Sequence, residues 1–103
     1  MAVIAVFSTF PNAEVASSVA RTLVDERLCA CVNLVPAVRS IYRWQGAICD
    51  EAEVLALIKT TDDRLAALEA RLVALHPYDV PELIALPIAG GHAPYLAWVA
   101  SAD

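Results

Sequence analysis

The sequence has 103 residues, of which 59% are hydrophobic, and a formal net charge of -5. This length suffices for one compact domain with its own core but not for two, so we predict a single domain over residues 1–103. The acidic balance and the scattered Lys and Arg residues argue against nucleic acid as a partner, which requires clustered positive charge. No apolar run reaches the roughly 18–20 residues of a membrane span, so we expect a soluble protein without membrane contact.

A strand and a helix are predicted first. The apolar, β-branched run AVIAVFST at residues 2–9 is typical of a central strand that is covered on both faces. An amphipathic helix follows; it starts after Asn12, a plausible N-cap, and runs to Leu28. Its apolar side chains recur at helical spacing, at Val15, Val19 and Leu23.

Residues 31–44 and 47–60 predict the two arms of an unusually long hairpin, joined by a turn at Gln45 and Gly46. Pro36 removes a backbone donor from the first arm and predicts a bulge or kink there. With this turn, alternation along the strands gathers one set of side chains on one face: Tyr42, Trp44, Cys49, Glu51 and Glu53.

The hairpin is too long for the domain that carries it. Its first arm would span roughly 40 Å, against about 30 Å for the diameter of a small domain, so its tip must overhang. An isolated two-stranded ribbon is marginal in water, and exposed Tyr42, Trp44 and Ile48 would invite uncontrolled strand pairing. We therefore predict that sister chains cover the tip in a homo-oligomer.

The second half of the chain predicts a helix, an edge strand and a short terminal helix. Residues 61–77 carry acidic side chains in the first turn, a stop at Pro77 and one apolar stripe, formed by Leu65, Leu68, Leu72 and Leu75. Residues 82–88 predict a strand whose Pro87 indicates an edge or an end. Residues 93–102 predict a short helix with three side chains inward: Tyr95, Trp98 and Val99.

This order of elements predicts an α+β fold, a ferredoxin-like βαββαβ sandwich with an extended hairpin and a short C-terminal helix. Three cysteines cannot all pair within one chain, and the length does not require disulfides. We expect free thiols and a cytoplasmic location. The sequence shows no serine-hydrolase elbow, no phosphate-binding glycine loop and no Cys and His pair suited to nucleophilic catalysis, so no enzymatic activity is predicted.

Five stretches, LCACVNLVP, SIYRWQG, EVLALIKT, HPYDVPELIALPI and YLAWV, together resemble the CutA divalent-cation tolerance proteins across nearly the whole chain. The resemblance implies a homotrimer of ferredoxin-like subunits locked by strand pairing, with a role in tolerance of copper and other divalent metals. It also implies a fold similar to that of the PII signalling proteins, which bind small ligands between subunits. The candidate residues of an intersubunit cleft are Tyr42, Trp44, Glu53, Lys59, Tyr78, Glu82 and Trp98.

Copper sites assigned in that family use a cysteine on the first strand and a histidine pair before the Pro-Tyr dipeptide. The corresponding positions here hold Ser8, Leu75 and His76. The resemblance therefore implies at most a weak metal site at His76, aided by His92 or Glu82, for Cu²⁺ or another divalent cation.

Each of these candidate site residues can also have a purely structural role. His76 also suits a helix C-terminus, Lys59 can be an ordinary strand-end lysine, and the aromatic residues can be interface or core anchors. Two alternatives to metal tolerance remain open: a PII-like module that binds a small anionic metabolite, and a structural trimer that docks a partner protein.

Overall fold

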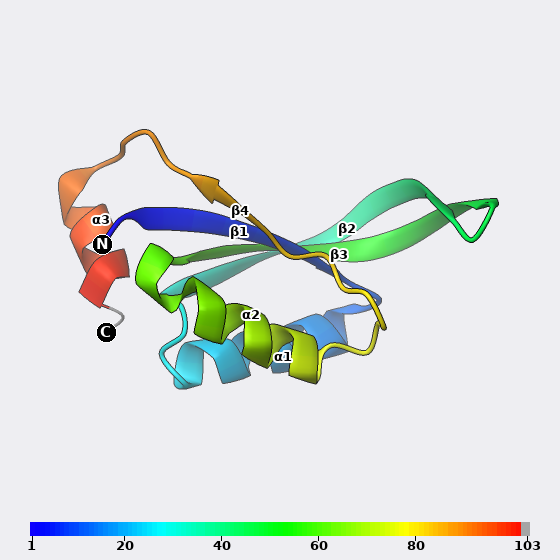
Figure 1. Ribbon diagram of the computed structural model, residues 1–103, viewed down its shortest axis with the longest axis horizontal. Helices are drawn as coiled ribbons and strands as arrows, with labels where there is room; N and C mark the ends of the chain where they lie inside the picture. The colour runs from blue at the N-terminus through cyan, green and yellow to red at the C-terminus, as the bar shows by residue number, and fades with distance from the viewer. Residues whose placement is uncertain (102–103) are drawn as a thin grey trace.

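Within residues 1–101, those that the computed structural model describes, the chain forms one four-stranded sheet with two of its three α-helices on one face (Figure 1). Its elements are β1 (Val3–Phe10), α1 (Ala13–Asp25), β2 (Cys31–Trp44), β3 (Ala47–Thr61), the 3-10 turn η1 (Asp62–Arg64), α2 (Leu65–Leu75), β4 (Ile84–Pro87) and α3 (Ala93–Ser101). The last residue of the predicted terminal helix, Ala102, lies outside the described residues, as does Asp103.

The strand order is β2-β3-β1-β4, and every neighbouring pair is antiparallel. The predicted α+β class and ferredoxin-like βαββαβ order are therefore confirmed. β1 lies inside the sheet between β3 and β4, as predicted, but helices cover only one of its two faces in the single chain, not both as its continuous apolar sequence predicted (Figure 1). β4 is an edge strand that ends at Pro87, where a missing backbone donor does no harm.

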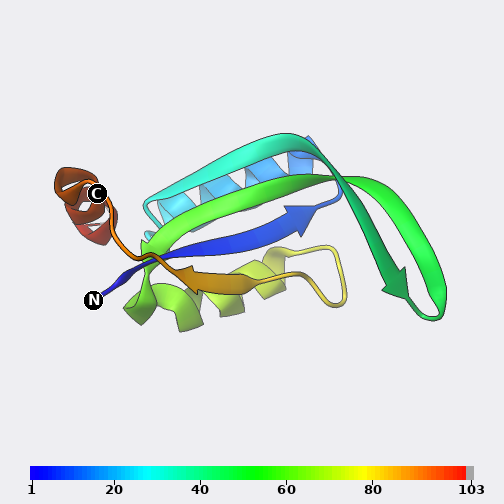
Figure 2. The ribbon, with the colours of Figure 1, turned by 90° about the horizontal axis from the view of Figure 1, so that it is seen from above.

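The hydrophobic core lies between the sheet and helices α1 and α2, which cover the same face in both views (Figures 1 and 2). α1 begins after Asn12, whose side-chain oxygen accepts a hydrogen bond of 2.9 Å from the backbone of Val15. The fully buried side chains of the two helices and the sheet include Leu23, Leu68, Leu72, Val6 and Ile58. The predicted leucine stripe of α2 is confirmed, with its two central members fully buried.

α1 is shorter than predicted, because it ends at Asp25 rather than at Leu28. Arg27 adopts a left-handed conformation, with φ of 60°. Its backbone N–H donates to Val24 and that of Leu28 donates to Leu23, which closes the helix in a Schellman motif. Leu28 then packs against the core, so its apolar character reflects the cap rather than another turn of helix.

The β2–β3 hairpin extends beyond the body, and the molecule measures 44 × 26 × 23 Å along its principal axes (Figures 1 and 2). Gln45 and Gly46 form its turn, with φ of 49° and 79°. Tyr42 pairs with Cys49 and Trp44 with Ala47. The pairing shifts between Val35 and Val38, around Pro36. The predicted turn, register and bulge are confirmed.

The face of the sheet opposite α1 and α2 has no helical layer over most of its area (Figure 1). The pairing register brings large apolar side chains to this bare face, since they alternate with the buried core residues: Phe7, Leu55, Leu57, Ile84 and Leu86. Ile84 and Leu86 remain 52% and 44% exposed. This face is a large apolar surface without a partner in the single chain.

α3 lies at the end of the sheet opposite the hairpin tip (Figure 1). Val99 is fully buried, as predicted, and Arg64 donates hydrogen bonds to the carbonyls of Val99 and Ala100. The prediction that Tyr95 and Trp98 also point inward is wrong for the single chain, in which they are 41% and 40% exposed. A helix this short buries only one narrow stripe. No helix within residues 1–101 is long and apolar enough to cross a membrane.

Candidate functional site

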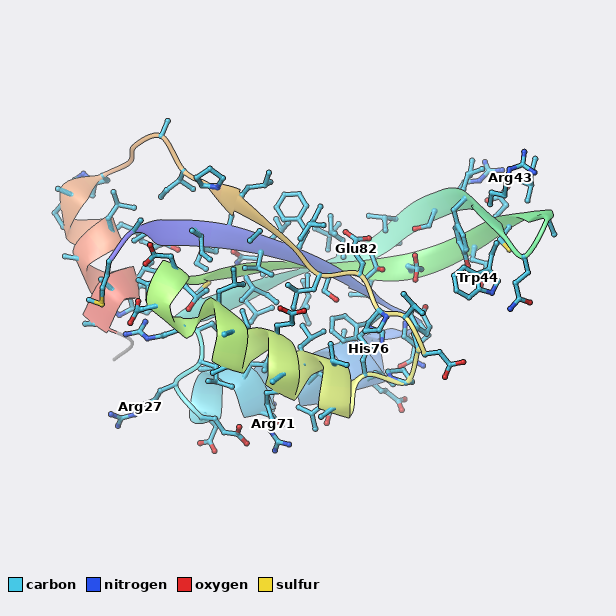
Figure 3. The ribbon with its side chains drawn as sticks, viewed as in Figure 1. Arg27, Arg43, Trp44, Arg71, His76 and Glu82 are labelled. Carbon is cyan, nitrogen blue, oxygen red and sulfur yellow. The ribbon has the colours of Figure 1, made fainter. Side chains whose placement is uncertain are left out.

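An open groove of about 740 Å³ lies between the hairpin and the segment that leads from α2 to β4. Figure 3 shows Trp44 projecting from one side of the hairpin and Arg43 from the other, with His76 and Glu82 on the α2–β4 segment. The lining residues come from three parts of the chain and are Thr9, Ser40, Ile41, Tyr42, Trp44, Cys49, Glu51, Glu53, Tyr78, Asp79, Val80 and Glu82.

The strand register explains why the hairpin contributes these side chains. Tyr42 pairs with Cys49, and alternate positions along both arms bring Glu51 and Glu53 to the same face. The predicted hairpin face is therefore confirmed as a wall of the groove. The other face carries an ion pair in which Arg39 Nη2 lies 2.6 Å from Asp50 Oδ2, and this hydrogen-bonded partner lowers the pKa of Asp50.

Two phenols donate hydrogen bonds to two carboxylates inside the groove. The Tyr42 hydroxyl lies 2.6 Å from Glu51 Oε1, and the Tyr78 hydroxyl lies 2.7 Å from Glu53 Oε2. The bond to Glu51 raises the pKa of Tyr42 to about 12, whereas burial and then the bond to Glu53 raise the pKa of Tyr78. Both phenols therefore stay protonated at neutral pH and fix the positions of the carboxylates.

The groove is strongly acidic. Four carboxylates line it, from Glu51, Glu53, Asp79 and Glu82, and its lining within the described residues includes no Lys or Arg. Like charges gathered along a concave surface concentrate cations near it. The arrangement therefore favours a positively charged ligand over an anionic one.

His76 lies beneath this region and is held by its neighbours. Its Nε2 donates to the carbonyl of Thr9 at 2.7 Å, and its Nδ1 accepts from the backbone N–H of Tyr78 at 3.1 Å. The ring stacks on Phe10 with centroids 4.6 Å apart, and the residue is 8% exposed. Both ring nitrogens are occupied, so this arrangement supports a structural role and gives no free lone pair to a metal.

Of the two residues predicted to aid a metal site at His76, Glu82 lies on the same α2–β4 segment and lines the groove, whereas His92 is not brought near it (Figure 3). His92 immediately precedes α3, at the end of the molecule far from the α2–β4 segment (Figure 1). Ser8 is fully buried, and Leu75 packs against the core. Throughout residues 1–101, no group of three or more His, Cys, Asp or Glu side chains converges as a metal site would require.

Lys59 and Trp98 also lie outside the groove. Lys59 is six residues from Glu53 along β3, or roughly 20 Å, and it donates a hydrogen bond to Asn33. Trp98 is on α3, where its ring lies 5.7 Å from that of Tyr95. One chain therefore brings together five of the seven cleft candidates, Tyr42, Trp44, Glu53, Tyr78 and Glu82.

Seven lining residues were not among the predicted site residues: Thr9, Ser40, Ile41, Cys49, Glu51, Asp79 and Val80. Glu51 and Cys49 had a usable signal, because they alternate with Glu53 on the same arm. Thr9 had none, since its contribution depends on how the end of β1 meets the hairpin. All three cysteines are free thiols; burial raises the pKa of Cys29 to about 12, and only Cys49 reaches the groove.

Comparison with known proteins identifies the family. The family described as "CutA1 divalent ion tolerance protein" matches residues 4–102. The chain belongs to this CutA1 family. It is 53% identical to the divalent-cation tolerance protein CutA of Thermus thermophilus over 94 aligned residues. The aligned region covers 91% of each of the two chains. The chain is 50% identical over 95 residues to human Protein CutA, covering 92% of this chain and 53% of the human protein.

Solved CutA1 structures share the fold closely. The divalent cation tolerance protein of Thermus thermophilus superposes with a TM-score of 0.93 at 50% identity, covering 96% of both chains. CutA1 from Oryza sativa superposes with a TM-score of 0.96 at 44% identity, covering 99% of this chain and 94% of the rice chain. The long hairpin is thus part of a shared architecture rather than a peculiarity of one sequence.

Proposed function

We propose that the protein acts as a homotrimer that contributes to tolerance of divalent cations by concentrating them in acidic clefts at the subunit boundaries. The observation that carries this proposal is the groove lined by four carboxylates and, among the described residues, by no basic side chain. The family to which the chain belongs is described by divalent ion tolerance, which agrees with a surface that attracts cations.

Two surfaces support the assembly. The bare sheet face exposes Ile84 and Leu86, and the hairpin exposes Trp44, Ile41 and Ile48, the last at 70%. A monomer would leave both surfaces and both free strand edges in water, which invites aggregation. A closed symmetric assembly with sister chains would bury both surfaces and both strand edges together. The Trp44 side of the hairpin also lines the groove, so the proposed cleft would lie where chains meet.

The chemistry of the lining determines which cations would bind. Carboxylate, hydroxyl and phenol oxygens suit hard ions such as Mg²⁺, Ca²⁺ and Mn²⁺. Ser8 and Leu75 replace two ligands of the copper sites that the family resemblance implies, and the nitrogens of His76 are occupied. We therefore expect Cu²⁺ to bind no more tightly than the usual order of divalent metals at carboxylates gives.

The alternatives receive less support. A PII-like module for an anionic metabolite would need positive charge in its cleft, and Lys59 lies far from the groove of its own chain. A purely structural trimer would leave the gathering of four carboxylates in one groove without a role. We further propose that the protein is not an enzyme and that it is cytoplasmic, where its three free thiols would stay reduced.

Paramagnetic NMR with Mn²⁺ tests the cation proposal even when binding is weak. Low Mn²⁺ concentrations should broaden the amide signals of Glu51, Glu53 and Glu82 before those of other acidic residues. Glu82→Gln should reduce this broadening, whereas Glu69→Gln, which removes an equal charge from the exposed side of α2, should not. Broadening distributed evenly over all surface carboxylates would contradict the proposal.

A further inference from the structure

The hairpin leaves the body (Figures 1 and 2) at a point where its own hydrogen-bonded pairing is interrupted. The pairing of β2 with β3 breaks off at Val35 and resumes at Val38, whose partner is Glu53. A bulge of this kind bends a strand and disrupts the ladder locally. Beyond it, Ile41 and Ile48 are exposed, so no core of its own holds the hairpin in place. The angle between the hairpin and the body therefore depends on contacts outside the ladder.

His76 joins the α2–β4 segment to the end of β1. Its Nε2 donates to the carbonyl of Thr9 at 2.7 Å, and its ring stacks on Phe10. Its Nδ1 accepts from the backbone N–H of Tyr78 at 3.1 Å. Because backbone groups of two segments use both nitrogens, the tautomer and the orientation of the imidazole are fixed. The position of Tyr78 is thereby tied to the body.

Tyr78 extends this connection to the hairpin. Its hydroxyl donates to Glu53 Oε2 at 2.7 Å, and its ring centroid lies 4.7 Å from that of His76. Hydrogen bonds to a charged acceptor are stronger than those between neutral groups. Burial, and then the bond to Glu53, raise the pKa of Tyr78, so the phenol remains a donor at neutral pH. Direct contacts therefore run from β1 through His76 and Tyr78 to the first residue pair beyond the bulge.

We propose that His76 and Tyr78 form a strap that holds the hairpin at a fixed angle to the body, with Glu53 as its point of attachment. A hairpin held in this way is ordered before anything pairs with it, so less conformational freedom is lost when another chain binds. The strap lies within one chain, and it gives His76 a role that needs no metal. The inference can therefore hold if the protein is not a trimer, and it can fail while Mn²⁺ still broadens the groove signals.

Two matched tyrosine variants test the strap in the full-length protein. Tyr78→Phe removes only the hydroxyl that reaches Glu53, whereas Tyr42→Phe removes a similar bond, of 2.6 Å to Glu51, that joins the two arms of the hairpin to each other. Backbone residual dipolar couplings measured by NMR give the orientation of residues 38–53 relative to the sheet and helices. In Tyr78→Phe the couplings of both arms should shrink together, while those of the body stay unchanged. In Tyr42→Phe the arms should keep the wild-type orientation.

Further variants separate the strap from a general loss of packing. Glu53→Gln keeps an oxygen that can accept from the phenol and should preserve the orientation of the hairpin. Glu53→Ala should reproduce the effect of Tyr78→Phe, and the two changes combined should cause no further loss, because both break the same bond. His76→Phe keeps a ring against Phe10 but removes both hydrogen bonds, and it should also free the hairpin. Unchanged hairpin couplings in Tyr78→Phe or His76→Phe, equal losses in Tyr42→Phe, or additive losses in the combined variant would overturn the proposal.

Discussion

Along β3 a single strand passes through two different environments. Val54, Ala56 and Ile58 are at most 4% exposed beneath the helices, whereas Ile48, near the start of the same strand, is 70% exposed. The first part is stabilised by burial within its own chain, and the second is held mainly by its hydrogen bonds to β2. The body should therefore fold on its own contacts, while the hairpin depends on whatever covers it.

Removing a side chain from the body should have the largest effect on stability. Leu72 is fully buried between α2 and the sheet, so Leu72→Ala should lower the free energy of unfolding by about 3 kcal/mol through lost burial and a residual cavity. Val73→Ala, on the 45% exposed side of the same helix, should cost less than about 0.5 kcal/mol. Urea unfolding at one fixed protein concentration measures both, and equal losses would contradict the described core.

The tip should respond in the opposite way. Trp44→Asp should disrupt assembly while the helical circular dichroism of the body persists, because only a neighbouring chain would cover this ring. Light scattering and circular dichroism on the same sample separate the two effects. Arg43→Asp changes charge on the adjacent residue, which projects from the other side of the hairpin (Figure 3), and tests whether the side matters. A Trp44→Asp protein of wild-type mass would show that the tip is ordinary surface.

Two left-handed residues allow a smaller comparison of the regions. Arg27 closes α1 with φ of 60°, and Gln45 lies in the hairpin turn with φ of 49°. Arg27→Gly should stabilise the body by about 0.5–1 kcal/mol, because glycine accepts this conformation without steric cost. Gln45→Gly should change the free energy of global unfolding by less than this, since the hairpin turn lies outside the core. Thermal unfolding of both variants measures this difference, and a larger gain from Gln45→Gly would reverse the comparison.

The smallest expected effect is confined to one phenol in the hairpin. The bond to Glu51 favours protonated Tyr42, so its folded pKa of about 12 exceeds the unfolded value near 10. The resulting stabilisation is complete below pH about 10 and is lost as the pH rises through about 12. Glu51→Gln should move the ultraviolet titration of this tyrosine toward 10, whereas Glu69→Gln should not. An unchanged titration would mean that the hydrogen bond is absent.

The sequence was most informative where a local signal has one structural meaning. The turn at Gln45 and Gly46, the interruption at Pro36 and the alternation between them predicted the hairpin register correctly. The amphipathic pattern likewise predicted both core-facing helices. These features depend on backbone rules that operate within a few residues.

Features set by distant segments were harder to predict. The burial of His76 depends on a carbonyl of Thr9, which lies 67 positions earlier in the chain. Tyr95 and Trp98 carry a helical apolar pattern, yet the sheet leaves room for only Val99. Lys59 shares a face with Glu53, but alternation gives the side of a strand and not the distance along it. Lys59 and Trp98, the two candidate cleft residues that lie outside the groove, therefore stay predictions.

The mass of the protein in dilute solution tests the central claim most directly, namely that sister chains cover the hairpin and the bare sheet face. Sedimentation equilibrium at low micromolar concentration, with hydrogen exchange on the same sample, should give three times the mass of one chain and slow exchange in the hairpin arms. A single-chain mass with a folded core and slowly exchanging arms would contradict the account.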